Sequence, residues 1–285
     1  MNNFSKKSKV AICLATKDRH SEVALLLQSL RTQTFQGWNL YIYDQSQTPM
    51  MNAHFIQCLI YRLKLEYHRI KLEYGISNGV CVARNKLIEM VELADNGEDL
   101  VIRLDDDCIP EPDYLEKLIE GIDKGYDLVS GIIPLCHTPE IKRDNKFIGN
   151  IINEHKFDDK GNLIENKDEC GYSYFEDKWY PTHQFRTNAL MKRELLNIKY
   201  PPFLSTVGFR EELFFSFKAI LSGYKLGVCT GAKAYHLQTP SGGVRDPNYS
   251  QKAQSDHQKA LDWIKETFQK EGDFLTKYNE RLLTK

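Results

Sequence analysis

Three consecutive aspartates, Asp105, Asp106 and Asp107, follow the apolar run of residues 100–104. Carboxylates this close repel one another, and a divalent cation between them removes that repulsion. Mg²⁺ and Mn²⁺ favour carboxylate oxygens and leave coordination positions for the phosphates of a substrate. The alternative interpretation of these three aspartates is a solvated acidic turn or the start of a helix near Pro112. The preceding apolar run favours a metal site at the end of a buried strand.

Polar residues also end two earlier apolar runs. Asp18 and Arg19 come after residues 10–15, and Asp44 follows residues 38–43. In an open α/β sheet, ligands bind beyond the carboxyl ends of the parallel strands. We therefore expect these side chains to lie on the same rim as the three aspartates.

The pattern of apolar residues alternates between short strands and amphipathic helices, which predicts an α/β fold with a mostly parallel sheet. Strands are predicted at residues 10–15, 38–43, within 65–74, and at 100–104, 127–133, 185–191, 225–230 and 232–236. Helices are predicted around Val23 to Leu30 and at residues 80–93, 114–122, 211–221 and 251–268. Residues 136–180 mix charged and aromatic letters without a period, which indicates an insertion of hairpins or loops.

Composition excludes several classes of protein. The chain has 285 residues, is 41% hydrophobic and has a formal net charge of −1, so it does not resemble a nucleic-acid-binding protein. Its seven cysteines are scattered singly, which argues against a disulfide framework or a zinc site and favours a reducing compartment. Because no apolar run approaches the length of a membrane span, we expect a cytoplasmic protein, with peripheral membrane contact left open. Its oligomeric state cannot be inferred.

Four segments, in the correct order, resemble family 2 glycosyltransferases of the GT-A fold. They are residues 10–19 (VAICLATKDR), 78–85 (NGVCVARN), 104–110 (LDDDCIP, similar to the D-x-D metal motif) and 211–218 (EELFFSFK) with Gly223-Tyr224. The resemblance implies a Rossmann-like mixed sheet flanked by helices, spanning residues 1–237. Residues 136–184 would form an insertion on the acceptor side, and residues 238–285 a flexible loop and a C-terminal helical extension.

The resemblance also implies the reaction. The protein would be a metal-dependent, inverting hexosyltransferase that moves a sugar from a nucleotide-diphosphate donor, by family habit a UDP-sugar, to a hydroxyl acceptor. That acceptor would belong to a glycan, a lipid-linked glycan, a wall polymer or a protein, as in polysaccharide biosynthesis. The implied cofactor is Mn²⁺ or Mg²⁺.

The resemblance assigns roles to individual residues. Asp107 would be the direct metal ligand, with His236 and Asp105 as further ligands, and Asp105 or Asp106 could serve the ribose instead. The nucleotide would be held by Thr16, Arg19, Asp44 and Arg84. Sugar contacts would come from Arg186, Thr187 and Asn188. Separately from the resemblance, Trp179 belongs to an aromatic stretch that could stack on a sugar or acceptor, with packing in the core as the alternative. Arg245, in the Gly/Pro-rich loop of residues 239–248, would approach the diphosphate when the loop closes.

Inversion at an anomeric carbon requires a carboxylate that takes the proton of the acceptor hydroxyl. The family usually has Glu-Asp at this helix start, whereas this chain has Glu211-Glu212. We expect Glu212 to be the base, with Glu211 as the second choice. The extra methylene of Glu212 leaves the position of its carboxylate open.

Two other enzyme classes and one non-enzyme class are less well supported. A sugar-nucleotide pyrophosphorylase would need a Gly-rich phosphate loop after the first strand, and residues 15–19 contain no glycine. The chain also lacks the G-x-G-x-x-G of dinucleotide-dependent oxidoreductases. A catalytically inactive nucleotide- or carbohydrate-binding module would not need the acidic run, Glu212 and His236.

Overall fold

The computed structural model describes residues 9–76, 78–137, 141–142, 154–164, 173–174, 178–185 and 187–283. Nine strands form its central sheet, in the order β11-β13-β6-β12-β4-β1-β2-β3, with β5 paired to β13. The strands are β1 (Val10–Thr16), β2 (Trp38–Asp44), β3 (Ile70–Tyr74), β4 (Leu100–Asp105), β5 (Cys108–Pro110), β6 (Leu128–Ile132), β11 (Trp179–Pro181), β12 (Ala189–Lys192) and β13 (Leu226–His236).

The sheet is mostly parallel. β1 pairs in parallel with both β2 and β4, β2 pairs with β3, and β13 pairs with β6. β12 lies antiparallel between β4 and β6, and β13 is antiparallel to β5 and β11. The predicted mixed, mostly parallel α/β fold is therefore confirmed.

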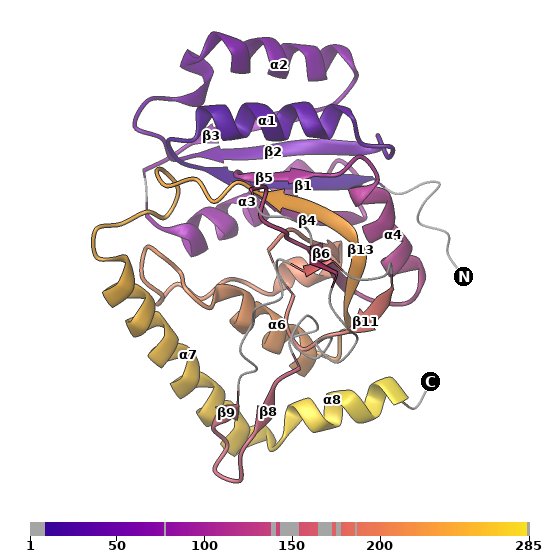
Figure 1. Ribbon diagram of the computed structural model, residues 1–285, viewed down its shortest axis with the longest axis vertical. Helices are drawn as coiled ribbons and strands as arrows, with labels where there is room; N and C mark the ends of the chain where they lie inside the picture. The colour runs from indigo at the N-terminus through magenta and orange to yellow at the C-terminus, as the bar shows by residue number, and fades with distance from the viewer. Residues whose placement is uncertain are drawn as a thin grey trace.

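Helices cover both faces of the sheet (Figure 1). They are α1 (His20–Arg31), α2 (His54–Leu65), α3 (Val80–Ala94), α4 (Tyr114–Asp123), α6 (Glu211–Leu221), α7 (Tyr249–Glu271) and α8 (Phe274–Leu283), with short 3₁₀ helices η2 (Met50–Asn52) and η5 (Arg193–Asn197). One apolar cluster joins α1, α2 and α4 to the sheet, and a second joins α3, α6, α7 and α8 to it. Central strands such as β1 are buried on both faces, which explains their continuous apolar letters.

The structure corrects the sequence expectations in three places. Helix α2 was not predicted, although Ile56, Ile60 and Leu63 are its buried stripe. The strand predicted at residues 185–191 begins only at Ala189. The two strands predicted at 225–230 and 232–236 are one strand, β13, with an irregularity after Val228. The predicted C-terminal helical extension consists of α7 and α8, and the apolar side of α8 packs against the second cluster.

The described parts of the predicted insertion contain short strands. β8 (Lys156–Phe157) and β9 (Leu163–Ile164) form a hairpin, and β7 (Ile141–Lys142) pairs with β10 (Ser173–Tyr174). β11 joins the edge of the main sheet. Among the described residues, no helix combines the length and the apolar character that crossing a bilayer requires.

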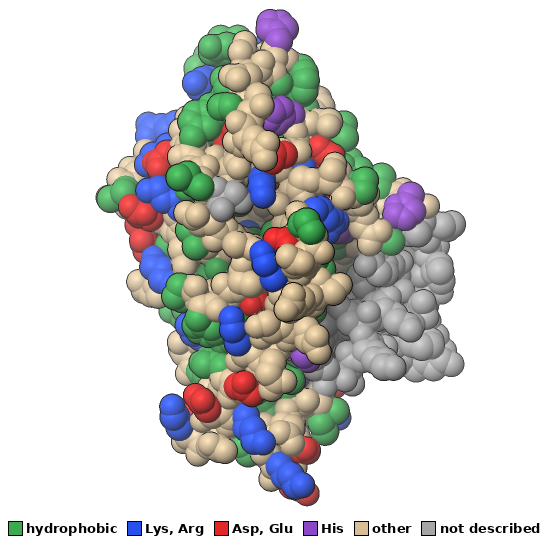
Figure 2. Space-filling model, turned by 90° about the vertical axis from the view of Figure 1, so that its left-hand side faces the viewer, with side chains coloured by type: hydrophobic (Ala, Val, Ile, Leu, Met, Phe, Trp, Pro, Cys, Tyr) green, Lys and Arg blue, Asp and Glu red, His purple; other side chains and the backbone are tan. Residues whose placement is uncertain are grey.

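Figure 2 shows the face of the molecule on which α7 lies. Basic and acidic side chains alternate over this face, and neither sign gathers into a continuous patch. This mixture agrees with the small net charge of −1. The face therefore has no broad electrostatic attraction for a polyanion.

Candidate active site

A cavity of about 580 Å³ opens beyond the carboxyl ends of β1 and β4. The amino ends of α3 and α6 and the loop after β13 complete its walls. Lining residues that could bind or react are Thr16, Lys17, Arg19, Gln45, Arg84, Arg103, Asp105, Asp106, Asp107, Thr187, Arg210, Glu211, Glu212, His236, Arg245 and Asp246. The predicted rim thus brings together side chains that are far apart in the sequence.

Asp106 is bound by two of the predicted nucleotide-binding residues. Arg19 Nη1 lies 2.7 Å from Asp106 Oδ1, and the Thr16 hydroxyl donates to Asp106 Oδ2 at 2.8 Å. Burial raises the pKa of Asp106 to about 6, against the attraction of Arg19. With both oxygens occupied by protein donors, Asp106 orients Thr16 and Arg19 along the cavity wall.

Asp107 and His236 form the pair best suited to bind a metal. His236 Nε2 lies 3.2 Å from Asp107 Oδ2, and the Arg19 guanidinium lies 2.9 Å from the same oxygen. The antiparallel pairing of β13 with β5 places His236 opposite Cys108. Burial raises the pKa of Asp107, but His236 and Arg19 outweigh this effect and lower it below its usual value. A carboxylate and an imidazole close together fit Mn²⁺, which accepts both ligand types.

Cys108 belongs to the same cluster by distance. The candidate ligand atoms of Asp107, Cys108 and His236 all lie within 4.8 Å of one another. Burial raises the pKa of the Cys108 thiol well above its usual value. A protonated thiol is a poor ligand for a hard cation, so the oxygen and nitrogen donors remain the candidates.

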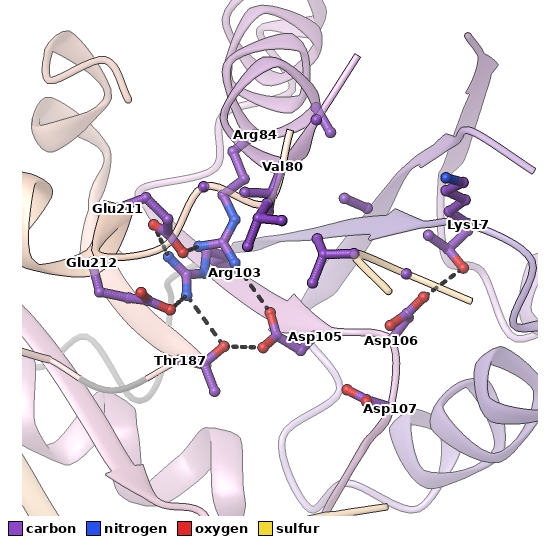
Figure 3. Close-up of a pocket in the computed structure, with 18 of the residues that line it drawn as sticks. Lys17, Val80, Arg84, Arg103, Asp105, Asp106, Asp107, Thr187, Glu211 and Glu212 are labelled. Carbon is purple, nitrogen blue, oxygen red and sulfur yellow. Dashed lines mark hydrogen bonds and ion pairs between the residues drawn. The ribbon is translucent and has the colours of Figure 1, made fainter. Parts of the chain in front are cut away.

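Asp105 is directed away from this pair. The Thr187 hydroxyl donates to one of its oxygens, and Arg84 Nη2 lies 3.4 Å from the other. Figure 3 shows Asp105 beside Thr187 and Arg103, whereas Asp106 and Asp107 lie on the other side of the strand end. Among the described residues, Asp105 is not part of the cluster that could hold a metal. This arrangement does not favour the expected role of Asp105 as a metal ligand.

The two glutamates at the start of α6 have different environments. Glu211 has a side chain that is 3% exposed and pairs with both Arg84 and Arg103. Glu212 has a side chain that is 24% exposed, and its Oε1 lies 2.8 Å from Arg103 Nη2. Burial raises the pKa of Glu211 well above its usual value. For Glu212, burial also acts to raise the pKa, but Arg103 outweighs it and the pKa is lowered. Glu212 is therefore the more accessible and the more readily ionised carboxylate.

Three predicted binding residues do not line the cavity. The Asp44 carboxylate is 1% exposed and accepts from the backbone N–H of Ser46 at 2.9 Å and of Met50 at 2.7 Å. It caps the turn after β2, a common use of a short acidic side chain. Asn188 is fully buried and accepts from the backbone N–H of Asp105 at 2.7 Å, so it orients the strand end.

Trp179 is the third of these residues. It lies on β11 at the edge of the sheet and stacks on Tyr126, with ring centroids 5.9 Å apart. It packs there because Gly121 leaves room for the indole: a Cβ at that glycine would lie 2.3 Å from the Trp179 ring. Arg186 lies outside the described residues.

The loop of residues 239–248 docks against the turn after β1. The Gly243 N–H donates to the Lys17 carbonyl at 2.8 Å, and Arg19 Nε donates to the Ser241 carbonyl at 3.2 Å. Gly242 has φ +70°, and a Cβ there would lie 2.7 Å from Arg19 Cγ, so only glycine allows this contact. Arg245 lines the cavity, as predicted for a residue near the diphosphate.

The sequence prediction missed Arg103. Its side chain is 6% exposed and lies between the two glutamates and Thr187. A single charge inside the otherwise apolar run of residues 100–104 was the available signal, because a buried charge requires partners.

Comparison with solved structures supports the fold. GalNAc-T7 with UDP, GalNAc and Mn²⁺ superposes with a TM-score of 0.64 at 14% identity, covering 89% of this chain and 48% of that one. TarS 1–349 of S. aureus in complex with UDP-GlcNAc gives 0.56 at 14% identity, covering 83% and 60%. This chain therefore spans less than two thirds of either protein. These similarities show the GT-A fold. No curated protein matches the sequence.

The family is shown by the sequence itself. Residues 11–198 match the model of glycosyl transferase family 2. This range includes all of β1 except Val10, the start of α3 and the acidic run at the end of β4. The chain belongs to glycosyl transferase family 2.

Proposed function

We propose that this protein is a metal-dependent, inverting glycosyltransferase that moves a sugar from a UDP-sugar to a hydroxyl acceptor. The supporting observation is that a pair of side chains suited to bind a metal and a carboxylate suited to act as a base line the same cavity. The Asp107–His236 pair lies on one wall, and the partly exposed carboxylate of Glu212 lies on another. A donor diphosphate on the first wall would present its sugar toward the second.

Asp107 and His236 would hold the divalent metal. When bound, the metal would neutralise the charge that develops on the departing diphosphate. Arg19, Lys17 and Arg245 line the same part of the cavity and would add positive charge around the phosphates. Arg19 already has its guanidinium beside Asp106 and Asp107, so only a small rearrangement would bring it to a phosphate oxygen.

Glu212 would act as the general base. The acceptor hydroxyl oxygen forms a bond to the anomeric carbon, the bond from that carbon to the β-phosphate oxygen breaks, and the hydroxyl proton passes to Glu212. Because the attack comes from the face opposite the leaving nucleotide, the configuration inverts. Glu211 is less suitable because two arginines already occupy its carboxylate.

Two structural relatives support the choice of UDP as the nucleotide and Mn²⁺ as the metal. GalNAc-T7 was solved with UDP and Mn²⁺, and TarS 1–349 with UDP-GlcNAc. The imidazole of His236 favours Mn²⁺ over Mg²⁺, which prefers oxygen ligands. The acceptor would be a hydroxyl of a glycan, a lipid-linked glycan, a wall polymer or a protein.

Titration calorimetry with UDP tests the metal-bridged donor site. We expect UDP to bind at least about tenfold more tightly with Mn²⁺ than with EDTA, and Asp107→Ala to remove that difference. Asp105→Asn is the matched control, since Asp105 lies outside the metal cluster and its variant should keep the Mn²⁺ dependence. Equal UDP affinity with and without Mn²⁺ in the wild type would contradict the proposal.

Incubation with a panel of UDP-hexoses and UDP-N-acetylhexosamines tests the reaction itself. A glycosyltransferase releases UDP, at a slow rate even when water is the acceptor. A sugar-nucleotide pyrophosphorylase would instead need inorganic pyrophosphate and release UTP. Formation of UTP rather than UDP would favour that alternative.

A further inference from the structure

Arg103 is a buried cation in the centre of the sheet. It lies on β4, between β1 and β12, and is 5% exposed. Taking a guanidinium out of water costs several kcal/mol unless partners of opposite charge surround it. Its neighbours in residues 100–104 are apolar, so strand formation does not require an arginine at this position. A role at the adjacent cavity is the simplest reason for it.

The contacts of Arg103 connect it to both glutamates of α6. Nη1 lies 3.1 Å from Glu211 Oε2, and Nη2 lies 2.8 Å from Glu212 Oε1. Nη1 also donates to the Tyr200 hydroxyl at 3.2 Å, and Nη2 to Thr187 Oγ1 at 3.2 Å. One planar guanidinium thus holds two carboxylates in a fixed relation, which a lysine ammonium cannot do with the same geometry.

Aromatic rings restrict the guanidinium. Its central carbon lies 5.2 Å from the centroid of Phe185 and 5.8 Å from that of Tyr200. Both distances are within the range of a cation–π contact. Rings on two neighbouring segments therefore limit how Arg103 can rotate, and the position of Nη2 is set before any substrate binds.

Glu211 is a structural partner, whereas Glu212 is the carboxylate that faces the cavity. Glu211 is held between Arg84 and Arg103 and is nearly inaccessible. Figure 3 shows both carboxylates directed toward Arg103. A glutamate has one more rotatable bond than the aspartate usual in this family, so its carboxylate can occupy more positions. The contact with Nη2 removes that freedom.

We propose that Arg103 is the positioning residue that holds the Glu212 carboxylate toward the cavity. This inference rests on the proposed role of Glu212 as the base. In this proposal Arg103 acts on the reaction only through Glu212.

The charges around Glu212 support this role of Arg103. Against the effect of burial, Arg103 lowers the pKa of Glu212 most strongly, and a hydrogen bond with Glu211 on α6 lowers it further, whereas Asp105 on β4 is a nearby carboxylate. Arg84 is occupied by Glu211 and Asp105. Arg103 is therefore the cation that opposes burial and keeps the pKa of Glu212 below its usual value.

Removal of Arg103 alone would leave a buried carboxylate without its partner and could unfold the protein. The test therefore compares Glu211→Gln with the double variant Arg103→Met/Glu211→Gln, which removes the guanidinium and replaces the carboxyl of its second partner with an amide. The two variants differ only at Arg103. Thermal melting would confirm that both are folded, and calorimetry with UDP and Mn²⁺ would confirm that both bind UDP as the wild type does.

The first readout does not depend on catalysis. The Glu212 carboxyl is titrated by ¹³C NMR on protein labelled at the glutamate carboxyl carbon, with its resonance identified by its loss in Glu212→Gln. We expect the midpoint to stay low in Glu211→Gln and to rise by about one pH unit or more in the double variant, because burial then acts without an opposing charge. An unchanged midpoint would overturn the proposal.

The second readout uses UDP release from the UDP-sugar of the panel that the wild type hydrolyses. In the double variant we expect kcat to fall about 100-fold relative to Glu211→Gln, with little change in KM for the donor. The acid limb of the pH profile of kcat should also move to higher pH, because the base then becomes ionised only at higher pH. Arg103→Lys/Glu211→Gln should restore the low NMR midpoint but only part of kcat, since the ammonium supplies charge without the planar fork.

The outcomes separate this inference from the proposed function. If the wild type releases no UDP from any donor while the NMR midpoint still depends on Arg103, the proposed function fails and the control of Glu212 by Arg103 stands. If the wild type is active but the double variant matches Glu211→Gln in midpoint, kcat and acid limb, Arg103 is only a core residue and the inference fails.

Discussion

Each aspartate of the acidic run has its own set of partners. Asp105 faces Thr187 and Arg84, Asp106 faces Thr16 and Arg19, and Asp107 faces His236 and Arg19. Like charges in adjacent positions are tolerated here because cations and hydroxyls separate them. The three residues therefore have three different environments, and of the three only Asp107 is paired with an imidazole.

At this scale we predict that Glu212→Gln abolishes transfer without affecting donor binding. The amide keeps the size of the side chain but cannot take a proton, so kcat should fall by about 10²- to 10⁴-fold. UDP release from the donor panel measures the rate, and calorimetry with UDP and Mn²⁺ measures binding. A Glu212→Gln enzyme with normal turnover would place the base elsewhere. Glu212→Asp, which restores the residue usual in the family, should retain part of the activity.

At the scale of elements, α7 anchors the segment that leads into α6. Asp256, on α7, is fully buried and accepts hydrogen bonds from the Ser205 N–H and hydroxyl at 2.7 Å and from the Phe209 N–H at 3.1 Å. The segment of residues 205–210 ends at Arg210, whose φ of +73° directs the chain into α6. The position of Glu211 and Glu212 thus depends on a helix far along the chain.

We predict that Asp256→Ala destabilises the protein by about 2–4 kcal/mol, because three hydrogen bonds to a buried carboxylate are lost. Urea unfolding followed by circular dichroism measures this change, and kcat for UDP release should fall as the start of α6 loosens. Asp262→Ala is the matched control on the exposed side of the same helix, where we expect less than about 0.5 kcal/mol. Equal unfolding midpoints for the two variants would contradict this assignment.

At the scale of the whole molecule, the C-terminal helices are part of the main core. Ala260, Ile264, Phe274, Leu275 and Tyr278 belong to the same buried cluster as α3 and α6. Tyr278 also accepts a hydrogen bond from the Leu226 N–H of β13 at 2.8 Å. The division expected at residues 237 and 238 therefore separates segments that share one core.

We predict that a chain ending at residue 237 does not fold by itself. Ending the chain there removes the five core side chains named above, four of which are large. Burying each large side chain contributes about 1.5–3 kcal/mol to the free energy of unfolding. Their sum is on the order of the net stability of a whole domain. Near-ultraviolet circular dichroism and urea unfolding would show this loss beside the full chain. A cooperative transition in the shortened chain would instead make residues 238–285 a separate extension.

The elements and the identities of the reactive residues could be predicted from the sequence. These features are local patterns: strand periodicity, the acidic run after residues 100–104, and the acidic pair Glu211-Glu212. Such patterns can be recognised within one stretch of sequence, without knowing which residues it contacts in the fold. The start and end of α6 were predicted to the residue. Helix α2 was missed because its exposed side also carries apolar residues, including Phe55, Tyr61 and Leu65, which blur the helical period.

What only the tertiary structure decided is which of these side chains meet. The Asp44 carboxylate accepts hydrogen bonds from the turn after β2, and Arg103, which the sequence presents as a strand residue, contacts both glutamates. Partners of a charged group come from strands and helices a hundred residues away, so their pairing depends on sheet order and on burial rather than on neighbouring letters. The sequence by itself determined the family and the chemical groups available, and packing decided which carboxylate faces the cavity and which is neutralised beneath it.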